Sequence, residues 1–205
     1  FQFIKSDEPE SNFKLIQKRT KGLEYTVDQF ENHFYILNNK DGSFNYKISK
    51  TPITKPSSDN WIDLIMHRED VLIENLDIFK DYWVVTERNN GLTNLRVQSW
   101  DGSENYIIPA EGEAYDMYTG FNPNFKTSKL RYGFTSMKTP RSVFEFDMVS
   151  KNKKLLKQQE IIDDNFRVNN YIEKRLFAWS RDGVNIPISL VYNKKTELKG
   201  DTPLL

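Results

Sequence analysis

The feature that most constrains this chain is a repeated pattern of short apolar runs. Three runs begin 48 residues apart: Phe34–Leu37, Tyr82–Val85 and Leu130–Phe134. A turn-forming residue follows each run, and these residues are 49 apart: Gly42, Gly91 and Pro140. Because the same reversal recurs at the same spacing, the pattern predicts a structural repeat in which Phe34, Tyr82 and Leu130 are equivalent.

Each repeat divides into four short β-rich segments separated by turn residues. The first contains Tyr25–Phe30, His33–Asn38, Phe44–Ile48 and Trp61–His67, with an insertion at Lys50–Ser58. The second contains Ile73–Phe79, Tyr82–Glu87, Leu92–Trp100 and Asn105–Ile108. The third contains Tyr115–Phe121, Lys129–Thr135, Ser142–Met148 and Lys153–Lys157. Four strands per unit are typical of a propeller blade.

A period in the high forties with four strands per unit favours a β-propeller over a β-sandwich. Blade boundaries are expected near Leu23, Asp70 and Glu113. Three blades cannot close a ring, and Phe13–Lys18 has the pattern of the last strand of a preceding blade. We therefore predict an all-β fold in which residues 1–165 form a partial propeller.

The pattern changes after about Asn165. A hairpin is expected from Arg175–Arg181 and Asn185–Tyr192, joined by a turn at Asp182-Gly183. Pro203–Leu205 resembles the opening of another buried strand. Residues 166–205 are therefore interpreted as a linker and the truncated start of a second domain, and both ends of the chain as cuts in a longer protein.

Composition excludes several classes of partner. The 29 basic and 29 acidic side chains cancel, so no one-sided charge points to nucleic acid or to an anionic membrane surface. No apolar run approaches the roughly 20 residues that span a bilayer. The absence of cysteine excludes a disulfide framework and favours a reducing compartment. We expect a cytoplasmic protein, with the periplasm as the alternative.

Three longer segments resemble the oligopeptidase B (protease II) branch of the prolyl oligopeptidase family of serine peptidases: Glu74–Val97, Leu130–Asp147 and Arg181–Lys195. The resemblance covers Trp61–Leu205, whereas residues 1–60 match mainly by repeat pattern. It implies that the first two segments lie in the last propeller blades and the third in the first hairpin of an α/β-hydrolase domain. It also implies a Ser-Asp-His peptidase that cuts short peptides after Arg or Lys, with the propeller shielding the site from folded proteins.

The chemistry of such a peptidase is not found in this sequence. A hydrolase nucleophile elbow needs a G-x-S-x-G pentapeptide, and none occurs. We expect the whole triad beyond Leu205 and assign no catalytic, cofactor or metal residue. His33 and His67 are interpreted as partly exposed strand-end residues, and the acidic pairs Asp63/Asp70 and Asp163/Asp164 as solvated loop charge.

Four charged residues are candidates for an interface between the two domains: Arg88, Arg131, Arg181 and Asp182. Gly91 is expected in a turn that requires a positive φ. Two functions remain open: the non-catalytic gating part of a peptidase, with short peptides as substrates of the intact protein, and a free propeller that serves as a protein-binding scaffold. We also expect the chain to self-associate through exposed blade faces or edges.

Overall fold

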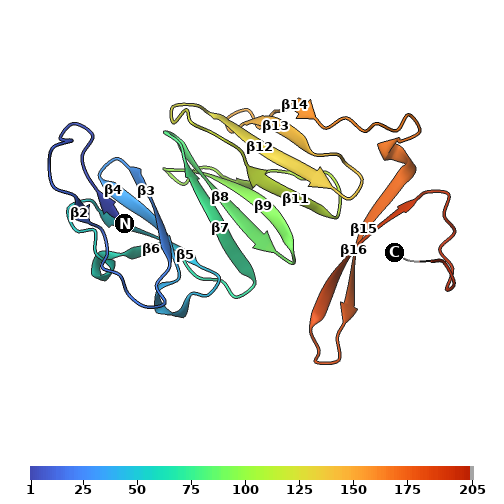
Figure 1. The fold of residues 1–205 in the computed structure, drawn as a ribbon, viewed down its shortest axis with the longest axis horizontal. Coiled ribbons are helices and arrows are strands. Elements are labelled where there is room, and N and C mark those ends of the chain that lie inside the picture. The colour runs from blue at the N-terminus through green and yellow to red at the C-terminus, as the bar shows by residue number, and fades with distance from the viewer. Residues whose placement is uncertain (204–205) are drawn as a thin grey trace.

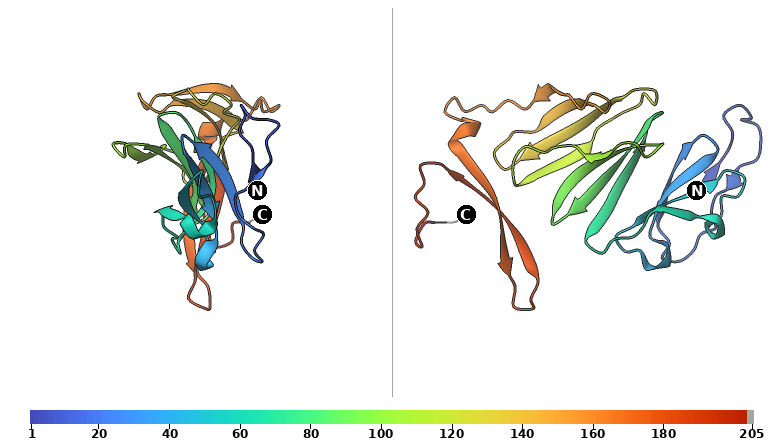
Figure 2. Two further views of the ribbon diagram at one scale, coloured as in Figure 1. Left: turned by 90° about the vertical axis from the view of Figure 1, so that its left-hand side faces the viewer. Right: turned by 180° about the vertical axis from the view of Figure 1, so that it is seen from behind.

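The computed structural model describes residues 1–203, and its regular secondary structure is almost entirely antiparallel β-strand (Figure 1). Leu204 and Leu205, the end of the strand expected at Pro203–Leu205, lie outside the described residues. Three four-stranded sheets stand side by side as a fan, and the views in Figure 2 show the same order from behind. No helix within residues 1–203 has the length and apolar content that a membrane span requires.

The three sheets have the strand order that consecutive propeller blades have. Blade 1 contains β3 (Tyr25–Phe30), β4 (His33–Asn38), β5 (Lys47–Pro52) and β6 (Ile62–Ile65). Blade 2 contains β7 (Val71–Ile78), β8 (Tyr82–Asn89), β9 (Leu92–Ser99) and β10 (Asn105–Ile107). Blade 3 contains β11 (Tyr115–Thr119), β12 (Lys129–Ser136), β13 (Ser142–Asp147) and β14 (Lys153–Gln158). Each strand pairs with its sequence neighbour, which confirms the predicted repeat.

The remaining elements lie at the two ends of the fan. β1 (Gln2–Phe3) pairs with β2 (Lys14–Leu15), and β15 (Tyr171–Trp179) pairs with β16 (Asn185–Asn193). Short 3-10 turns occupy Lys40–Gly42, Ser58–Asn60 and Val168–Asn170. Figure 1 places the β1–β2 pair and the β15–β16 hairpin at opposite ends of the long axis. The hairpin predicted after Asn165 is thus present, although both of its strands are longer than expected.

Apolar side chains fill the spaces between successive blades. Between blades 1 and 2 lie Tyr35, Leu37, Ile48, Ile73, Leu76, Trp83 and Val85. Between blades 2 and 3 lie residues that include Val84, Leu95, Val97, Leu130, Tyr132 and Phe134. Because the strands alternate faces, each central strand supplies one set of residues to the preceding blade and another to the next.

This alternation corrects the predicted equivalence of Phe34, Tyr82 and Leu130. Phe34 and Leu130 face the preceding side of their blades, whereas Tyr82 packs against the core shared with the following blade. The residue of blade 2 that faces the preceding blade is Trp83. Moving one residue along a strand moves to the opposite face of the sheet. The apolar runs therefore begin 48 residues apart, but the residues that face the preceding blade do not keep that spacing.

The third strand of blade 1 also differs from the prediction. The segment expected as Phe44–Ile48 is observed as β5, Lys47–Pro52. Asp41, Gly42 and Tyr46 have φ values of 58°, 77° and 60°, so the chain makes a wide reversal instead of a tight turn at Gly42. Phe44 is left exposed in this reversal, where it packs edge-on against His67.

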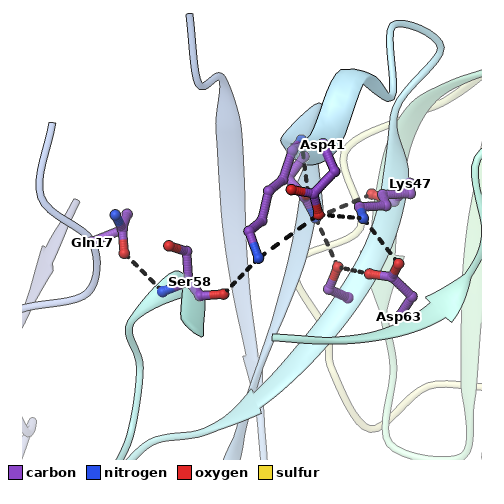
Figure 3. A network of polar contacts seen from close by, with 8 residues as sticks. Gln17, Asp41, Lys47, Ser58 and Asp63 are labelled. Carbon is purple, nitrogen blue, oxygen red and sulfur yellow. Dashed lines mark hydrogen bonds and ion pairs between the residues drawn. The ribbon is translucent and has the colours of Figure 1, made fainter. Parts of the chain in front are cut away.

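A polar network holds the inserted connection onto blade 1 (Figure 3). Lys47 Nζ, in a buried side chain, lies 2.9 Å from Asp63 Oδ2, and Ser49 Oγ donates to the same carboxylate at 2.7 Å. Lys40 Nζ donates to the carbonyl oxygen of Ser58, whose amide donates to Gln17 Oε1. Asp63 is therefore the counter-ion of a buried lysine, and its interpretation as solvated loop charge was wrong.

Candidate functional site

The loops at one end of the blades form the surface that meets the β15–β16 hairpin, and we call this surface the rim. Antiparallel pairing brings four connections to the same end: residues 66–70, 89–92, 108–114 and 137–141. Glu113, in the third connection, accepts a hydrogen bond from the backbone amide of Arg175 at 3.1 Å. The Arg175 guanidinium donates to the carbonyl oxygen of Asn90 in the second connection. Strand β15 is thus joined to two adjacent loops of the rim.

A buried carboxylate fixes the rim of blade 2. Glu87 is 3% exposed and lies two residues before the end of β8. Its Oε1 lies 2.5 Å from Arg68 Nη2, and its Oε2 lies 3.1 Å from Arg96 Nη2. Arg96 Nε lies 3.2 Å from each oxygen. The two arginines come from the connection before β7 and from β9, so Glu87 ties a loop to the two central strands.

Arg88 links blade 2 to blade 3. Its Nε lies 2.6 Å from Glu74 Oε1, and its Nη2 lies 3.7 Å from Asp116 Oδ1. Hydrogen bonding to Glu74 raises the pKa of the Arg88 guanidinium. Asp116 also accepts a hydrogen bond from Thr93 at 2.8 Å. The partners that Arg88 has within residues 1–203 therefore belong to the blades and not to the hairpin.

The other three candidate interface residues lie elsewhere. Arg131 is on β12, paired across the sheet with Glu145 on the face that points away from blade 2. Arg181 and Asp182 form the tip of the β15–β16 hairpin. Hydrogen bonds from Ser180 and from the Val184 amide lower the pKa of the Asp182 carboxyl, so this residue stabilises its own turn. The four residues do not form one cluster in this structure.

Sequence reasoning missed the residues that do join the hairpin to the rim. Glu173 and Arg175 are two residues apart on β15 and therefore on one face, which points to the propeller. Glu173 is 5% exposed. No local motif marks either residue, because their partners are some 60 to 85 positions away in sequence.

The two histidines do not form a catalytic pair or a metal site. His33 begins β4, as predicted, and His67 follows β6 and packs against Phe44. Within residues 1–203, no group of three or more histidine, aspartate or glutamate side chains is arranged to hold a metal ion. The contacts that the rim makes with β15 are hydrogen bonds of charged groups.

The fold defines a class of protein: a β-propeller built from four-stranded antiparallel blades. The comparisons with known proteins agree. Residues 3–159 match the family model described as the prolyl oligopeptidase N-terminal β-propeller domain. The chain belongs to the prolyl oligopeptidase family.

Two curated relatives align along nearly the whole chain. Dipeptidyl aminopeptidase BI of Pseudoxanthomonas mexicana is 36% identical over 194 residues, which cover 94% of this chain and 26% of that protein. Protease 2 of Moraxella lacunata is 24% identical over 210 residues, which cover 98% of this chain and 28% of that protein. The chain spans about a quarter of the length of these relatives.

Solved structures give the same result. Oligopeptidase B from Leishmania major superposes with a TM-score of 0.80 at 26% identity, covering 91% of this chain and 27% of that one. Oligopeptidase B from Trypanosoma brucei, with covalently bound antipain in a closed form, gives the same values. The partial propeller predicted from the repeat is thereby confirmed.

Proposed function

We propose that this chain is the gating propeller of a serine oligopeptidase, in which the β15–β16 hairpin is the first part of an α/β-hydrolase domain. The observation that carries the proposal is the structural similarity to oligopeptidase B, at a TM-score of 0.80, over 91% of the chain including its blades. The resemblance of Arg181–Lys195 to the start of the hydrolase domain supports the same division near residue 165. Family membership weakens the alternative of a free scaffold, because relatives named as a dipeptidyl aminopeptidase and a protease align with 94% and 98% of the chain.

In this proposal the propeller keeps folded proteins away from the active site, and the hydrolase domain supplies the catalytic triad. A ring of blades over the catalytic serine admits a flexible peptide but not a folded protein. The triad serine would be activated by histidine, which the aspartate orients, and backbone amides would stabilise the oxyanion. The substrates would be short peptides cut after Arg or Lys, as the resemblance to oligopeptidase B implies.

A second candidate activity follows from a specific observation. The relative that is 36% identical is named a dipeptidyl aminopeptidase, whereas the relative named protease 2 is 24% identical. A dipeptidyl aminopeptidase removes two residues from a free N-terminus and so requires the α-ammonium group of its substrate. An oligopeptidase has no such requirement.

One experiment on the whole protein separates these activities. Three fluorogenic substrates would be compared: an N-blocked peptide ending in Arg, the matching dipeptide with a free amine, and the N-blocked peptide with Glu in place of Arg. The oligopeptidase proposal expects cleavage of the first substrate and little of the third. Cleavage of the free dipeptide alone would transfer the assignment to dipeptidyl aminopeptidase, and equal cleavage of the Glu peptide would refute basic specificity.

Gating is tested separately with a folded protein and its unfolded fragments. The fragments should be cut and the folded protein left intact under the same conditions. We also propose a cytoplasmic location, which the cysteine-free composition favours over the periplasm. Cell fractionation followed by immunoblotting tests that location directly.

A further inference from the structure

Two glycines of the rim lie directly under charged side chains of β15. Gly91 has a φ of +74°, and Arg175 Nη2 is 2.7 Å from the position that a Cβ would occupy there. Gly112 has a φ of +107°, and Glu173 Oε1 is 1.8 Å from the corresponding Cβ position. Both loops therefore leave room for an incoming side chain only because the residue beneath it is glycine.

The two charged residues belong to one face of a two-faced hairpin. Glu173 and Arg175 share their face with Pro187, whose Cγ is 3.9 Å from the Cβ position at Gly91. The opposite face carries Ile172, Leu176, Ala178, Ile186, Ile188 and Leu190, together with Lys174 and Tyr192, whereas Phe177, Trp179 and Val191 share the face of Glu173 and Arg175. The hairpin thus directs Glu173 and Arg175 to the propeller and places most of its aliphatic side chains on the other side.

Where the hairpin contacts the rim, some hydrogen-bonding atoms of Glu173 and Arg175 lack a partner in the described part of the chain. Both carboxylate oxygens of Glu173 and the Nε of Arg175 are buried without a hydrogen-bond partner among residues 1–203. A buried charged group that lacks hydrogen bonds destabilises the state that buries it. The hydrogen bonds from Arg175 to Asn90 and Glu113 act in the opposite direction, so this contact both gains and loses free energy when the hairpin lies on the rim.

We propose that Gly91 and Gly112 form a two-point docking seat for the second domain, in which Arg175 and Glu173 are the positioning residues. The seat sets the position of the hydrolase domain on the rim between blades 2 and 3, and release of the two side chains lets the hairpin leave as a unit. This inference rests on the proposed function for the identity of the second domain. The contact itself involves only residues of this chain.

The chain offers a matched control for the test. Gly102, in the connection between β9 and β10, has the same φ of +74° as Gly91, but no atom lies within 4 Å of its Cβ position. Gly91→Ala and Gly102→Ala therefore impose the same backbone strain, and only the first pushes on Arg175. The difference between the two variants isolates the seat.

Hydrogen exchange of the peptide covering Tyr171–Trp179 would be measured by mass spectrometry in the whole protein. Gly91→Ala and Gly112→Ala should each speed exchange there about tenfold, because the added Cβ overlaps the side chain of β15 above it and so disfavours the docked hairpin. Gly102→Ala should leave exchange at β15 unchanged. In an Arg175→Ala background, in which no arginine side chain lies over Gly91, Gly91→Ala should add little.

The docking seat would be rejected if the Tyr171–Trp179 peptide exchanged at the same rate in the Gly91→Ala and Gly102→Ala proteins. It would also be rejected if the effects of Gly91→Ala and Arg175→Ala on this exchange were fully additive. Peptide hydrolysis is recorded for the same samples but does not enter this readout. A protein that cleaves none of the test peptides but shows the exchange pattern retains the seat and loses the proposed function. A protein that cleaves the test peptides but lacks the exchange pattern rejects the seat and retains the proposed function.

Discussion

Replacing Glu87 with glutamine should destabilise the propeller far more than replacing a half-buried glutamate whose lysine partner is exposed. Glu87 is buried, and its two oxygens receive four close contacts from Arg68 and Arg96. Glutamine keeps the shape but puts an NH2 group against two guanidinium groups, so at least half of these contacts are lost. Breaking a fully buried ion pair costs about 3–5 kcal/mol.

The expected loss is smaller than that range because the two arginines keep access to water. Their side chains are 33% and 25% exposed, so part of the stranded charge is hydrated again. We expect a decrease in the free energy of unfolding of about 2 kcal/mol. For a protein of this size, that decrease lowers the melting temperature by about 4–8 °C.

The assay is urea unfolding of the 205-residue chain at low concentration, followed by tryptophan fluorescence. Trp83 is buried in the same blade, so its fluorescence reports the unfolding of that blade. The control is Glu145→Gln, which removes a pair with a Lys129 side chain that is 55% exposed. That variant should lose about 0.5 kcal/mol or less. A loss for Glu87→Gln no larger than the loss for the control would refute the reasoning.

Five further predictions concern other parts of the chain. Gly133→Ala places a Cβ 2.1 Å from Cζ of Tyr118 and should cost about 1–3 kcal/mol, and most of this loss should disappear in a Tyr118→Ala background. Hydrogen bonds from Ser99 and Ser103 lower the pKa of Asp101 to about 2, so Asp101→Asn should be less stable than wild type at pH 7, and the gap should close as pH falls from about 4 towards 2. Burial raises the pKa of Asp77, so the effect on stability has the opposite sign. Asp77→Asn should be more stable than wild type at pH 7 and equally stable at a pH below the ordinary aspartate pKa. Melting curves of both aspartate variants, recorded at the high and the low pH, check these two predictions. The 205-residue chain should not hydrolyse an Arg-containing fluorogenic peptide, and stoichiometric labelling of a serine by a phosphonate probe, with turnover, would contradict this. The chain should also self-associate in light scattering over a concentration series, through the apolar face of the hairpin or the β14 edge, and a monodisperse monomer at high concentration is the opposite outcome.

The sequence was sufficient to predict the blades because their burial is periodic. Each central strand, such as Tyr82–Asn89, is an apolar run bounded by turn residues, and this pattern survives small shifts in strand ends. The same pattern cannot define which residue faces which blade. Tyr82 and Trp83 are both large and aromatic, and only the packing shows that Trp83 occupies the position of Phe34.

Prediction failed where distant segments decide the local structure. β5 begins at Lys47 because that lysine forms a buried ion pair with Asp63, a partner that no local pattern identifies. The hairpin contact depends on Glu173 meeting Gly112 and on Arg175 meeting Gly91. Gly91 was expected only as a turn residue, and its positive φ confirms that part of its role.

The two faces of the β15–β16 hairpin determine where this protein can be divided. A truncation that ends at Asn165 leaves Gly91 and Gly112 uncovered, but neither residue has a side chain, and water can replace Glu173 and Arg175 above them. A truncation placed just after Asn193 keeps the rim covered and exposes the side that carries Leu176, Ile186 and Ile188. The shorter piece should therefore be the better one for crystallisation or for raising antibodies against the native propeller, even though it omits a regular strand pair.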